Sequence, residues 1–322
     1  MIRHGLSRRS LLTGLAGILA APGIGLAAVP SPRVVATTGM IADAARAIGG
    51  EIEVQALMGP GVDPHAYRQT RSDIAAMLRA DIVFWNGLFL EAQMQEFLTG
   101  LTRRTKVVAV AENVPEDRRL SHADYAGQFD PHVWMVPDLW ASAVAAVRDA
   151  LIEVRPKARA TFEANADTYL AEVAAVGDYA REVLGTIPEA SRVLITAHDA
   201  FGYLGREYGL EVLGIQGIST ESEAGLARIG ELVDLIVERR IGAVFVESSV
   251  SDRNVRALIE GARAQGHEVM VGGELYSDAM GEAGTYEGTY LGMIDHNVTT
   301  IAEALGGTAP EHGLNGKLKA EG

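Results

Sequence analysis

The stretch PKARATFEANADTYLAEVAAVGDYAREVL, residues 156–184, predicts one long helix between two similar halves of the chain. Its apolar residues recur at alternating steps of four and three, the spacing of a single stripe on a helix. They are Phe162, Ala166, Tyr169, Val173, Val176, Ala180 and Val183. A helix of roughly 28 residues would span about 42 Å, the width of a small domain. We therefore expect a stiff brace between two domains, and an ordinary surface helix of one larger domain is the alternative.

Each side of this helix carries its own alternation of strands and helices. Four apolar strands are predicted in each half, at 34–38, 51–57, 81–85, 106–110, 193–196, 211–215, 243–247 and 267–271. Helices are predicted at 40–48, 71–78, 90–101, 137–154, 200–208, 224–239, 252–264 and 287–305. Such alternation is typical of parallel sheets with right-handed crossovers. The expected fold class is α/β, with two (β/α)4 lobes joined by one long rigid helix.

Composition narrows the class of partner and of site. The 322 residues carry a net charge of -14 and a pI near 5.0, which disfavours nucleic acids and anionic membranes as partners. The chain has no cysteine, which excludes disulfides, thiolate metal sites, cysteine nucleophiles and a lipid-modified cysteine. A transition-metal site in this chain must therefore use imidazole and carboxylate ligands.

The first 28 residues have the anatomy of a signal peptide. Arg3, Arg8 and Arg9 precede an apolar run that is rich in glycine and alanine, and small residues follow at 25–28. The segment SRRSLL, residues 7–12, resembles a twin-arginine export motif, and an ordinary secretory signal is the alternative. We expect a soluble, monomeric periplasmic protein with no membrane insertion after cleavage.

The predicted domain organisation follows from these segments. It consists of a signal peptide at 1–28, an N-terminal lobe at 29–155, a linking helix at 156–186, a C-terminal lobe at 187–308 and a loose tail at 309–322.

Three histidines and one aspartate stand where strands of the two halves end. His65 follows the second predicted strand, His198 follows the fifth, and Asp278 follows the last. His132 lies between a loop and a helix. Ligands of open α/β sheets bind at the carboxyl ends of strands, so these four side chains can converge between the halves. Three imidazoles and a carboxylate suit a divalent ion with four or five ligands.

Each of the four also has an ordinary alternative. A single loop histidine is usually solvated, His198 can be satisfied by backbone at a helix start, and Asp278 can cap a helix or a turn. The tripeptide Asp-Pro-His occurs twice, at 63–65 and 130–132, and its proline restricts the backbone beside each histidine. Asp63 and Asp130 are candidates to orient an imidazole.

Several nearby residues have weaker cases. Glu247 at the end of a strand is interpreted as a cap or salt-bridge residue in preference to a partner of the site. Trp85 and Trp134 either keep water from the site or only fill the core. Glu221 and Glu223 are interpreted as solvated loop or partner-facing residues, and His296 as structural.

Seven segments together resemble one known family. They are MGPGVDPHAY (58–67), NGLFLE (86–91), DPHVWM (130–135), AHDAFGYLGREYGL (197–210), GISTESEAG (217–225), VFVESS (244–249) and GGELYSDAMG (272–281), and TYEGTYLGMIDHN (285–297) continues the likeness. They resemble the cluster A-I, or TroA-like and ZnuA-like, solute-binding proteins of manganese and zinc ABC importers. The resemblance implies one divalent metal ion in the cleft between two lobes, with His65, His132, His198 and Asp278 as ligands, and an ABC permease as partner.

The identity of the metal stays open at this point. Many manganese-type relatives carry glutamate where this chain has His198, and imidazole there suits zinc while admitting manganese or iron. Many zinc-dedicated relatives have a histidine-rich loop before the second ligand, whereas the 111–131 loop here holds only His122 before the Asp-Pro-His motif. Two other functions compete with transport: a zinc hydrolase with an open metal position, and a metal-binding adhesin. No H-E-x-x-H motif or nucleophile elbow supports a hydrolase.

Overall fold

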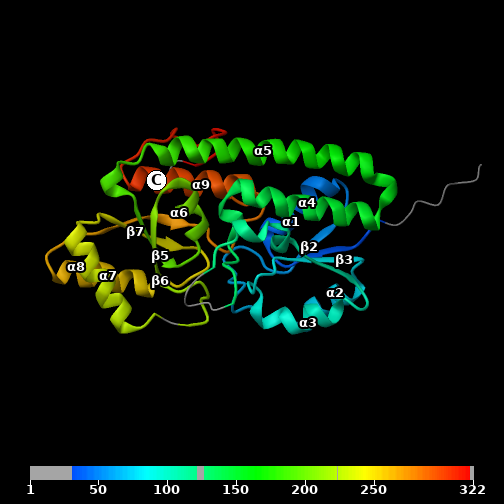
Figure 1. Ribbon diagram of the computed structural model, residues 1–322, viewed down its shortest axis with the longest axis horizontal. Coiled ribbons are helices and arrows are strands. Elements are labelled where there is room, and N and C mark those ends of the chain that lie inside the picture. The colour runs from blue at the N-terminus through cyan, green and yellow to red at the C-terminus, as the bar shows by residue number, and fades with distance from the viewer. Residues whose placement is uncertain (1–30, 122–126, 223, 320–322) are drawn as a thin grey trace, which may run out of the picture. The chain divides into compact units, whose positions relative to one another are not determined.

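The computed structural model describes residues 31–121, 127–222 and 224–319 (Figure 1). The predicted signal peptide, His4, His122 and Glu223 lie outside the described residues. The strands are β1 Val34–Ala36, β2 Val54–Ala56, β3 Ile82–Trp85, β4 Lys106–Ala109, β5 Val193–His198, β6 Glu211–Gln216, β7 Ala243–Glu247 and β8 Met270–Leu275. The helices are α1 Gly39–Gly49, α2 Arg71–Arg79, α3 Gln95–Leu101, α4 Pro137–Val154, α5 Arg159–Gly185, α6 Gly202–Tyr208, α7 Leu226–Arg239, α8 Arg253–Ala264 and α9 Tyr290–Ala304.

The first half is built on one parallel sheet in the order β2-β1-β3-β4. Alternate residues of its central strands face opposite layers, as the two-residue period of a strand requires. Val34 and Phe84 pack with the core of α1 and α4, while Val35 and Val83 pack with α2 and α3. Both faces are therefore covered, which explains why Ile82–Trp85 is apolar throughout.

The second half contains two parallel pairs, β5 with β6 and β7 with β8. β5 and β7 lie next to each other, so the pairs are neighbours in space. All named strand pairs in the described ranges are parallel, and this confirms the predicted sheet type.

The last strand lies further along the chain than the pattern predicted. The expected strand was 267–271, whereas β8 runs from Met270 to Leu275 and includes two glycines. A Cβ at Gly272 would lie 2.8 Å from the Phe245 ring, and a Cβ at Gly273 would lie 2.3 Å from the Thr300 side chain. These glycines therefore allow the strand to approach its neighbours closely, although in sequence they resemble a turn.

The long helix is confirmed. A short 3₁₀ turn, Pro156–Ala158, leads into α5, and all seven residues of the predicted apolar stripe are buried. α5 packs against α1 and α4 of the first half and against α9 of the second (Figure 1). One hydrophobic cluster contains Val34, Phe162 and Leu305, so it continues from one half to the other along this helix. The lobe boundaries at 155 and 187 remain predictions.

The segment after α9 is tied down where a loose tail was expected. The Leu314 N–H donates to both carboxylate oxygens of Asp295, at 2.9 and 3.0 Å, and Leu318 is buried. Asp295 is itself fully buried in α9, so it needs donors of this kind. The polar, glycine-rich composition of the tail did not reveal this requirement.

Candidate metal centre

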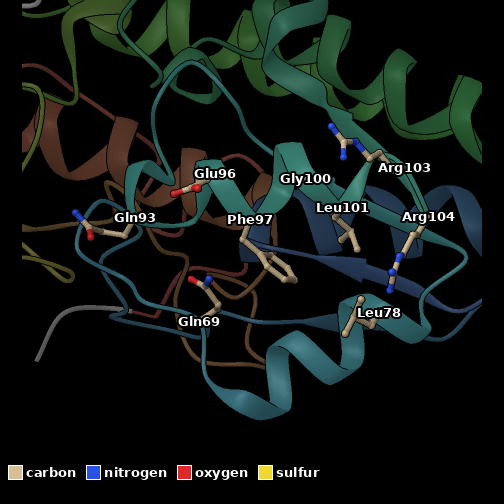
Figure 2. A pocket seen from close by; sticks show the side chains of 9 residues that line it. All are labelled: Gln69, Leu78, Gln93, Glu96, Phe97, Gly100, Leu101, Arg103 and Arg104. Atoms are coloured by element: carbon tan, nitrogen blue, oxygen red, sulfur yellow. The ribbon is translucent and has the colours of Figure 1, made fainter.

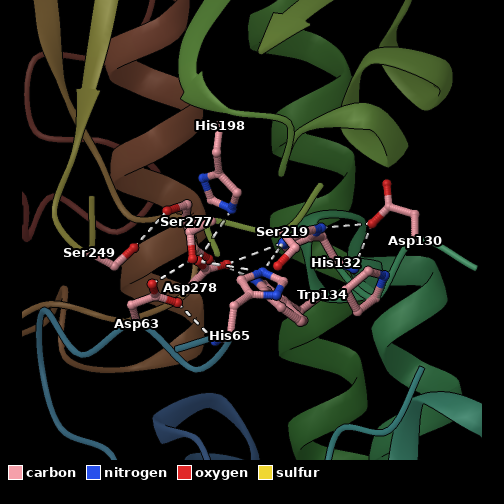
Figure 3. Close-up of polar contacts among 12 residues, drawn as sticks. Asp63, His65, Asp130, His132, Trp134, His198, Ser219, Ser249, Ser277 and Asp278 are labelled. Atoms are coloured by element: carbon pink, nitrogen blue, oxygen red, sulfur yellow. Dashed lines mark hydrogen bonds and ion pairs between the residues drawn. The ribbon is translucent and has the colours of Figure 1, made fainter. Parts of the chain in front are cut away.

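The four predicted ligands come from four separate segments and meet at one point (Figure 3). His65 lies in the loop after β2, His132 precedes a 3₁₀ turn at Val133–Met135, His198 is the last residue of β5, and Asp278 follows β8. The three histidines are 0% exposed and Asp278 is 2% exposed. One ligand atom from each residue lies within 4.8 Å of all the others, and this is the one group of metal-ligating residues found among the described residues.

The distances fit a single ion. His65 Nε2 lies 3.3 Å from His132 Nε2, and the Asp278 oxygens lie 3.3 Å from His132 Nε2 and 3.2 Å from His198 Nε2. An ion with tetrahedral bonds of about 2.0–2.1 Å separates its ligand atoms by about 3.3 Å. Asp278 Oδ2 is 4.0 Å from His65 Nε2, farther than it is from His198 Nε2. The residues present therefore fit one divalent metal.

Unsatisfied atoms also point to a cation. His198 Nε2 and both Asp278 oxygens are buried and have no hydrogen-bond partner within the described part of the chain. Burial raises the pKa of Asp278, but the histidines around it, His198 foremost, outweigh burial and hold that pKa well below its usual range. A buried carboxylate that stays ionised needs a positive charge beside it. A metal ion would supply that charge and bind all of these atoms.

The Nε2 atoms of His132 and His198 face the centre, and the Nδ1–H of each ring donates a hydrogen bond to a carboxylate. Asp130 Oδ1 lies 2.7 Å from His132 Nδ1, and Glu247 Oε2 lies 2.5 Å from His198 Nδ1. Each carboxylate also accepts the backbone N–H of its histidine, at 2.9 and 2.8 Å. These bonds keep a proton on Nδ1 and direct Nε2 to the centre, where it can bind a metal once its own proton has left, which is a common arrangement for metal-binding histidines.

The same carboxylates change the basicity of the two rings. Burial lowers the pKa of His132, but Asp130 outweighs it and raises that pKa to about 9. Burial likewise lowers the pKa of His198, and Glu247 with Asp278 raises it well above its ordinary value. Glu247 does form an ion pair, as one interpretation of the sequence had it, but its partner is His198, so the preference against a role at the site was wrong. A signal was present, because an acid that ends a buried strand needs a partner at the same edge of the sheet.

His65 lies in different surroundings. Its Nδ1 is buried and has no hydrogen-bond partner among the described residues. Its backbone N–H donates to Asp63 Oδ1 at 2.8 Å, so Asp63 orients the backbone and not, as one prediction had it, the imidazole. Burial lowers the pKa of His65 to about 3, so the ring is neutral and ready to bind a metal at ordinary pH.

A fully buried carboxylate holds the loop next to His132. Glu91 Oε1 accepts from the Thr37 hydroxyl at 2.6 Å and from the Asn86 N–H at 2.8 Å. The Asn86 amide donates to the Pro131 carbonyl at 3.1 Å, directly before His132. The motif NGLFLE, noted in the sequence only as a resemblance, thus supports the segment that carries a ligand.

Aromatic residues close one side of the centre. The Trp134 ring packs edge-to-face on His132 with centroids 5.2 Å apart, and its Nε1 donates to the Ser277 carbonyl at 2.8 Å. The Tyr290 hydroxyl donates to the Trp134 carbonyl at 2.9 Å. Trp85 packs in the core between the sheet and α3, so of the two predicted tryptophans only Trp134 touches a ligand.

The remaining histidines in the described ranges have local partners. His296 Nε2 bonds the Glu274 carbonyl at 2.8 Å, as a structural role predicts, and His267 and His312 bond the carbonyls of Ile241 and Leu318. A pocket of about 610 Å³ lies elsewhere, beside α2 and α3, and is lined by Phe97, Arg103 and Arg104 among others (Figure 2). It contains none of the four predicted ligands.

Comparisons with known proteins agree with this geometry. A family profile described as zinc-uptake complex component A, periplasmic (ZnuA), matches residues 34–304. The chain is 47% identical over 274 residues to the manganese-binding lipoprotein MntA of Bacillus subtilis, with 85% of this chain and 89% of that protein covered. It is 46% identical over 280 residues to the zinc-binding protein TroA of Treponema pallidum, with 87% and 90% covered. It is 32% identical over 276 residues to the iron-binding protein YfeA of Yersinia pestis, with 85% and 86% covered.

The fold is shared as well. The solved structure of the periplasmic zinc-binding protein TroA from Treponema pallidum matches with a TM-score of 0.84 at 45% identity, covering 86% of this chain and 99% of that one. The matching families contain metal-binding transport components and not enzymes, so the hydrolase alternative is set aside. The chain belongs to the zinc-uptake component A family, the extracytoplasmic metal-binding components of ABC metal importers.

Proposed function

We propose that this protein captures one divalent transition metal with His65, His132, His198 and Asp278 and delivers it to an ABC permease. The observation that carries the proposal is the convergence of these four buried side chains within 4.8 Å. Four protein ligands around one ion suit binding and release, whereas a catalytic zinc usually keeps a position open for water.

The metal that we propose is zinc or manganese, with iron as a third candidate. The donor set of three imidazoles and one carboxylate favours zinc over manganese by the general affinity order of divalent metals. The similar proteins carry all three metals in their names, manganese in MntA, zinc in TroA and iron in YfeA. Metal analysis of the protein purified from its native compartment decides the cargo, because affinity in solution favours zinc regardless of what the cell loads.

We also propose that the protein acts as a periplasmic monomer after export by the 1–28 segment. None of the helices in the described ranges combines the length and the apolar character needed to cross a bilayer. Replacing Arg8 and Arg9 by lysine tests the export route. Unchanged export of that variant would rule out the twin-arginine pathway.

The ligand assignment is tested by replacing Asp278 with alanine. Loss of the only carboxylate in the set should weaken zinc binding by about a hundredfold or more. Replacing a residue that only hydrogen-bonds to a metal ligand already lowers metal affinity by about 10- to 100-fold. Competition titration against a chelator measures the affinity, and circular dichroism checks that the fold persists. Asp178→Ala on the exposed face of α5 is the matched control, because the Asp178 side chain is 84% exposed. Equal affinities of the two variants would refute the assignment.

A further inference from the structure

The side chains that would hold a metal at this centre are almost completely buried by the described residues. All four ligands are between 0% and 2% exposed. Some segment that covers the centre must therefore move each time a metal enters or leaves. The contacts that join the two halves around the centre indicate which segment moves most easily.

One set of these contacts is buried and aromatic. Trp134 Nε1 bonds the Ser277 carbonyl, and the Tyr290 hydroxyl bonds the Trp134 carbonyl, with both rings at most 1% exposed. Opening this side would expose two large aromatic side chains and leave buried polar groups without partners. We therefore expect this side to stay closed during metal exchange.

A second set of contacts is smaller and reaches the surface. It is made by residues 217–222, here called the clasp loop, which belong to the second half of the chain. Thr220 Oγ1 donates to Asp63 Oδ2 of the first half at 2.5 Å, and Glu221 accepts from the Gln93 amide of the first half. Thr220 is half-buried and Glu221 is exposed. Water can replace such contacts, so opening them has a small free-energy cost.

The clasp loop is connected to a ligand through one carboxylate. Asp63 Oδ2 accepts from Thr220, while Asp63 Oδ1 accepts from the His65 N–H at 2.8 Å. The His65 ring has no partner of its own at Nδ1 among the described residues. Ser219 of the same loop lies beside the ligands in Figure 3. Movement of the clasp loop would therefore uncover the centre and loosen the His65 backbone together.

We propose that the clasp loop is the gate for metal exchange and that Thr220 is a positioning residue, which holds His65 in place through Asp63. The proposal rests on the proposed function, because it concerns the release of a bound metal. It explains how a buried site releases its ion while the long helix keeps the two halves together.

Stopped-flow transfer of zinc from the loaded protein to an excess of a chromophoric chelator tests the gate. Thr220→Val keeps the branched shape and removes the donor, and it should speed release by about fivefold, the worth of a modest hydrogen bond. Its affinity should change less than its release rate, because a looser gate also speeds entry. Thr220→Ser keeps the hydroxyl and should restore the slow rate. Thr168→Val is the matched control, because the Thr168 hydroxyl bonds only its own helix.

A crosslink provides a second and independent test. The chain has no cysteine, so Gln93→Cys with Glu221→Cys introduces the only two thiols. Joining them with a short bis-maleimide should slow zinc release by at least about tenfold relative to the same variant blocked with N-ethylmaleimide. Release at the same rate from both forms, or from Thr220→Val and Thr220→Ser, would overturn the gate. A wild-type protein that binds no zinc or manganese would instead overturn the proposed function.

Discussion

The tripeptide Asp-Pro-His occurs twice in this chain, and the histidine rings of its two copies differ in their hydrogen bonding. In both, the aspartate accepts the backbone N–H of the histidine two residues later, at 2.8 Å in the 63–65 copy and at 2.9 Å in the 130–132 copy. In the second copy, the same Asp130 oxygen also accepts a hydrogen bond from the ring Nδ1–H of His132. In the first copy, Asp63 turns its other oxygen to Thr220, and the His65 ring is left without a partner at Nδ1.

The difference changes the chemistry of two proposed ligands that are otherwise equivalent. The pKa of His132 is raised to about 9, because Asp130 outweighs the effect of burial, while burial lowers the pKa of His65 to about 3. Without a metal, the His132 ring therefore carries a second proton near neutral pH and is positively charged, whereas the His65 ring is neutral. A metal must displace the proton from His132 but meets a free lone pair on His65. The centre thus combines a ring that a carboxylate orients at Nδ1 with one whose Nδ1 has no partner among the described residues.

The largest effect should come from removing each ring in turn. His132→Ala and His65→Ala should each weaken zinc binding by about a hundredfold or more, since each removes a ligand. Their effects on the metal-free fold should differ. Both variants leave a cavity, and His132→Ala also leaves the buried Asp130 without its ring partner, so it should cost about 3 kcal/mol more than His65→Ala. Urea unfolding of the chelator-treated variants measures this difference, and equal losses would show that Asp130 does not distinguish the two copies.

A smaller effect is expected from the aspartates themselves. Asp130→Asn keeps the shape of the side chain but removes the charge that orients His132, and it should weaken zinc binding by about 10- to 100-fold. Asp63→Asn is the matched variant in the other copy and should cost about threefold, because Asp63 bonds the His65 backbone and the Thr220 hydroxyl but not the His65 ring. Competition titrations of both variants give the ratio of their zinc affinities. A larger loss for Asp63→Asn would reverse the assignment of the ring that a carboxylate orients.

A third difference between the two copies concerns pH. The pKa of His132 in the metal-free fold, about 9, is above its unfolded value, so its proton stabilises that fold fully below about pH 6.5. That stabilisation is lost as the pH rises through about 9. The metal competes for the same lone pair, so zinc affinity should rise with pH across this window, by up to about tenfold per unit for this one proton.

Competition titrations at pH 6, 7 and 8 measure this slope. The slope of log affinity against pH counts the protons that metal binding releases. Asp130→Asn should lower this slope by about one, and Asp63→Asn should leave it unchanged, because the pKa of His65 is already about 3. A slope that is the same in wild type and in Asp130→Asn would contradict the proton on His132.

Much of the framework follows from local pattern. The 3.6-residue period of 156–184 predicted α5 and its buried face, and the apolar strands predicted parallel sheets. The strand ends predicted four ligands that the fold does bring together. β8 was displaced because its glycines, chosen for close packing against Phe245 and Thr300, resemble a turn in sequence. The bonds of the tail were not predicted, because its partner Asp295 is a buried residue of the preceding helix, 19 positions before Leu314.

The sequence by itself determined the long helix, the alternation of strands and helices, the absence of thiol ligands and the restricted backbone beside the histidine of each Asp-Pro-His tripeptide. Those properties depend on residues that are a few positions apart, so short stretches of sequence are enough to predict them. Only the tertiary structure decided that Glu247 supports His198, that Asp130 reaches a ring, and that Asp63 reaches Thr220, 157 residues away. Burial and charge depend on which distant side chains surround a group, so two identical tripeptides acquire opposite pKa shifts once the chain is folded.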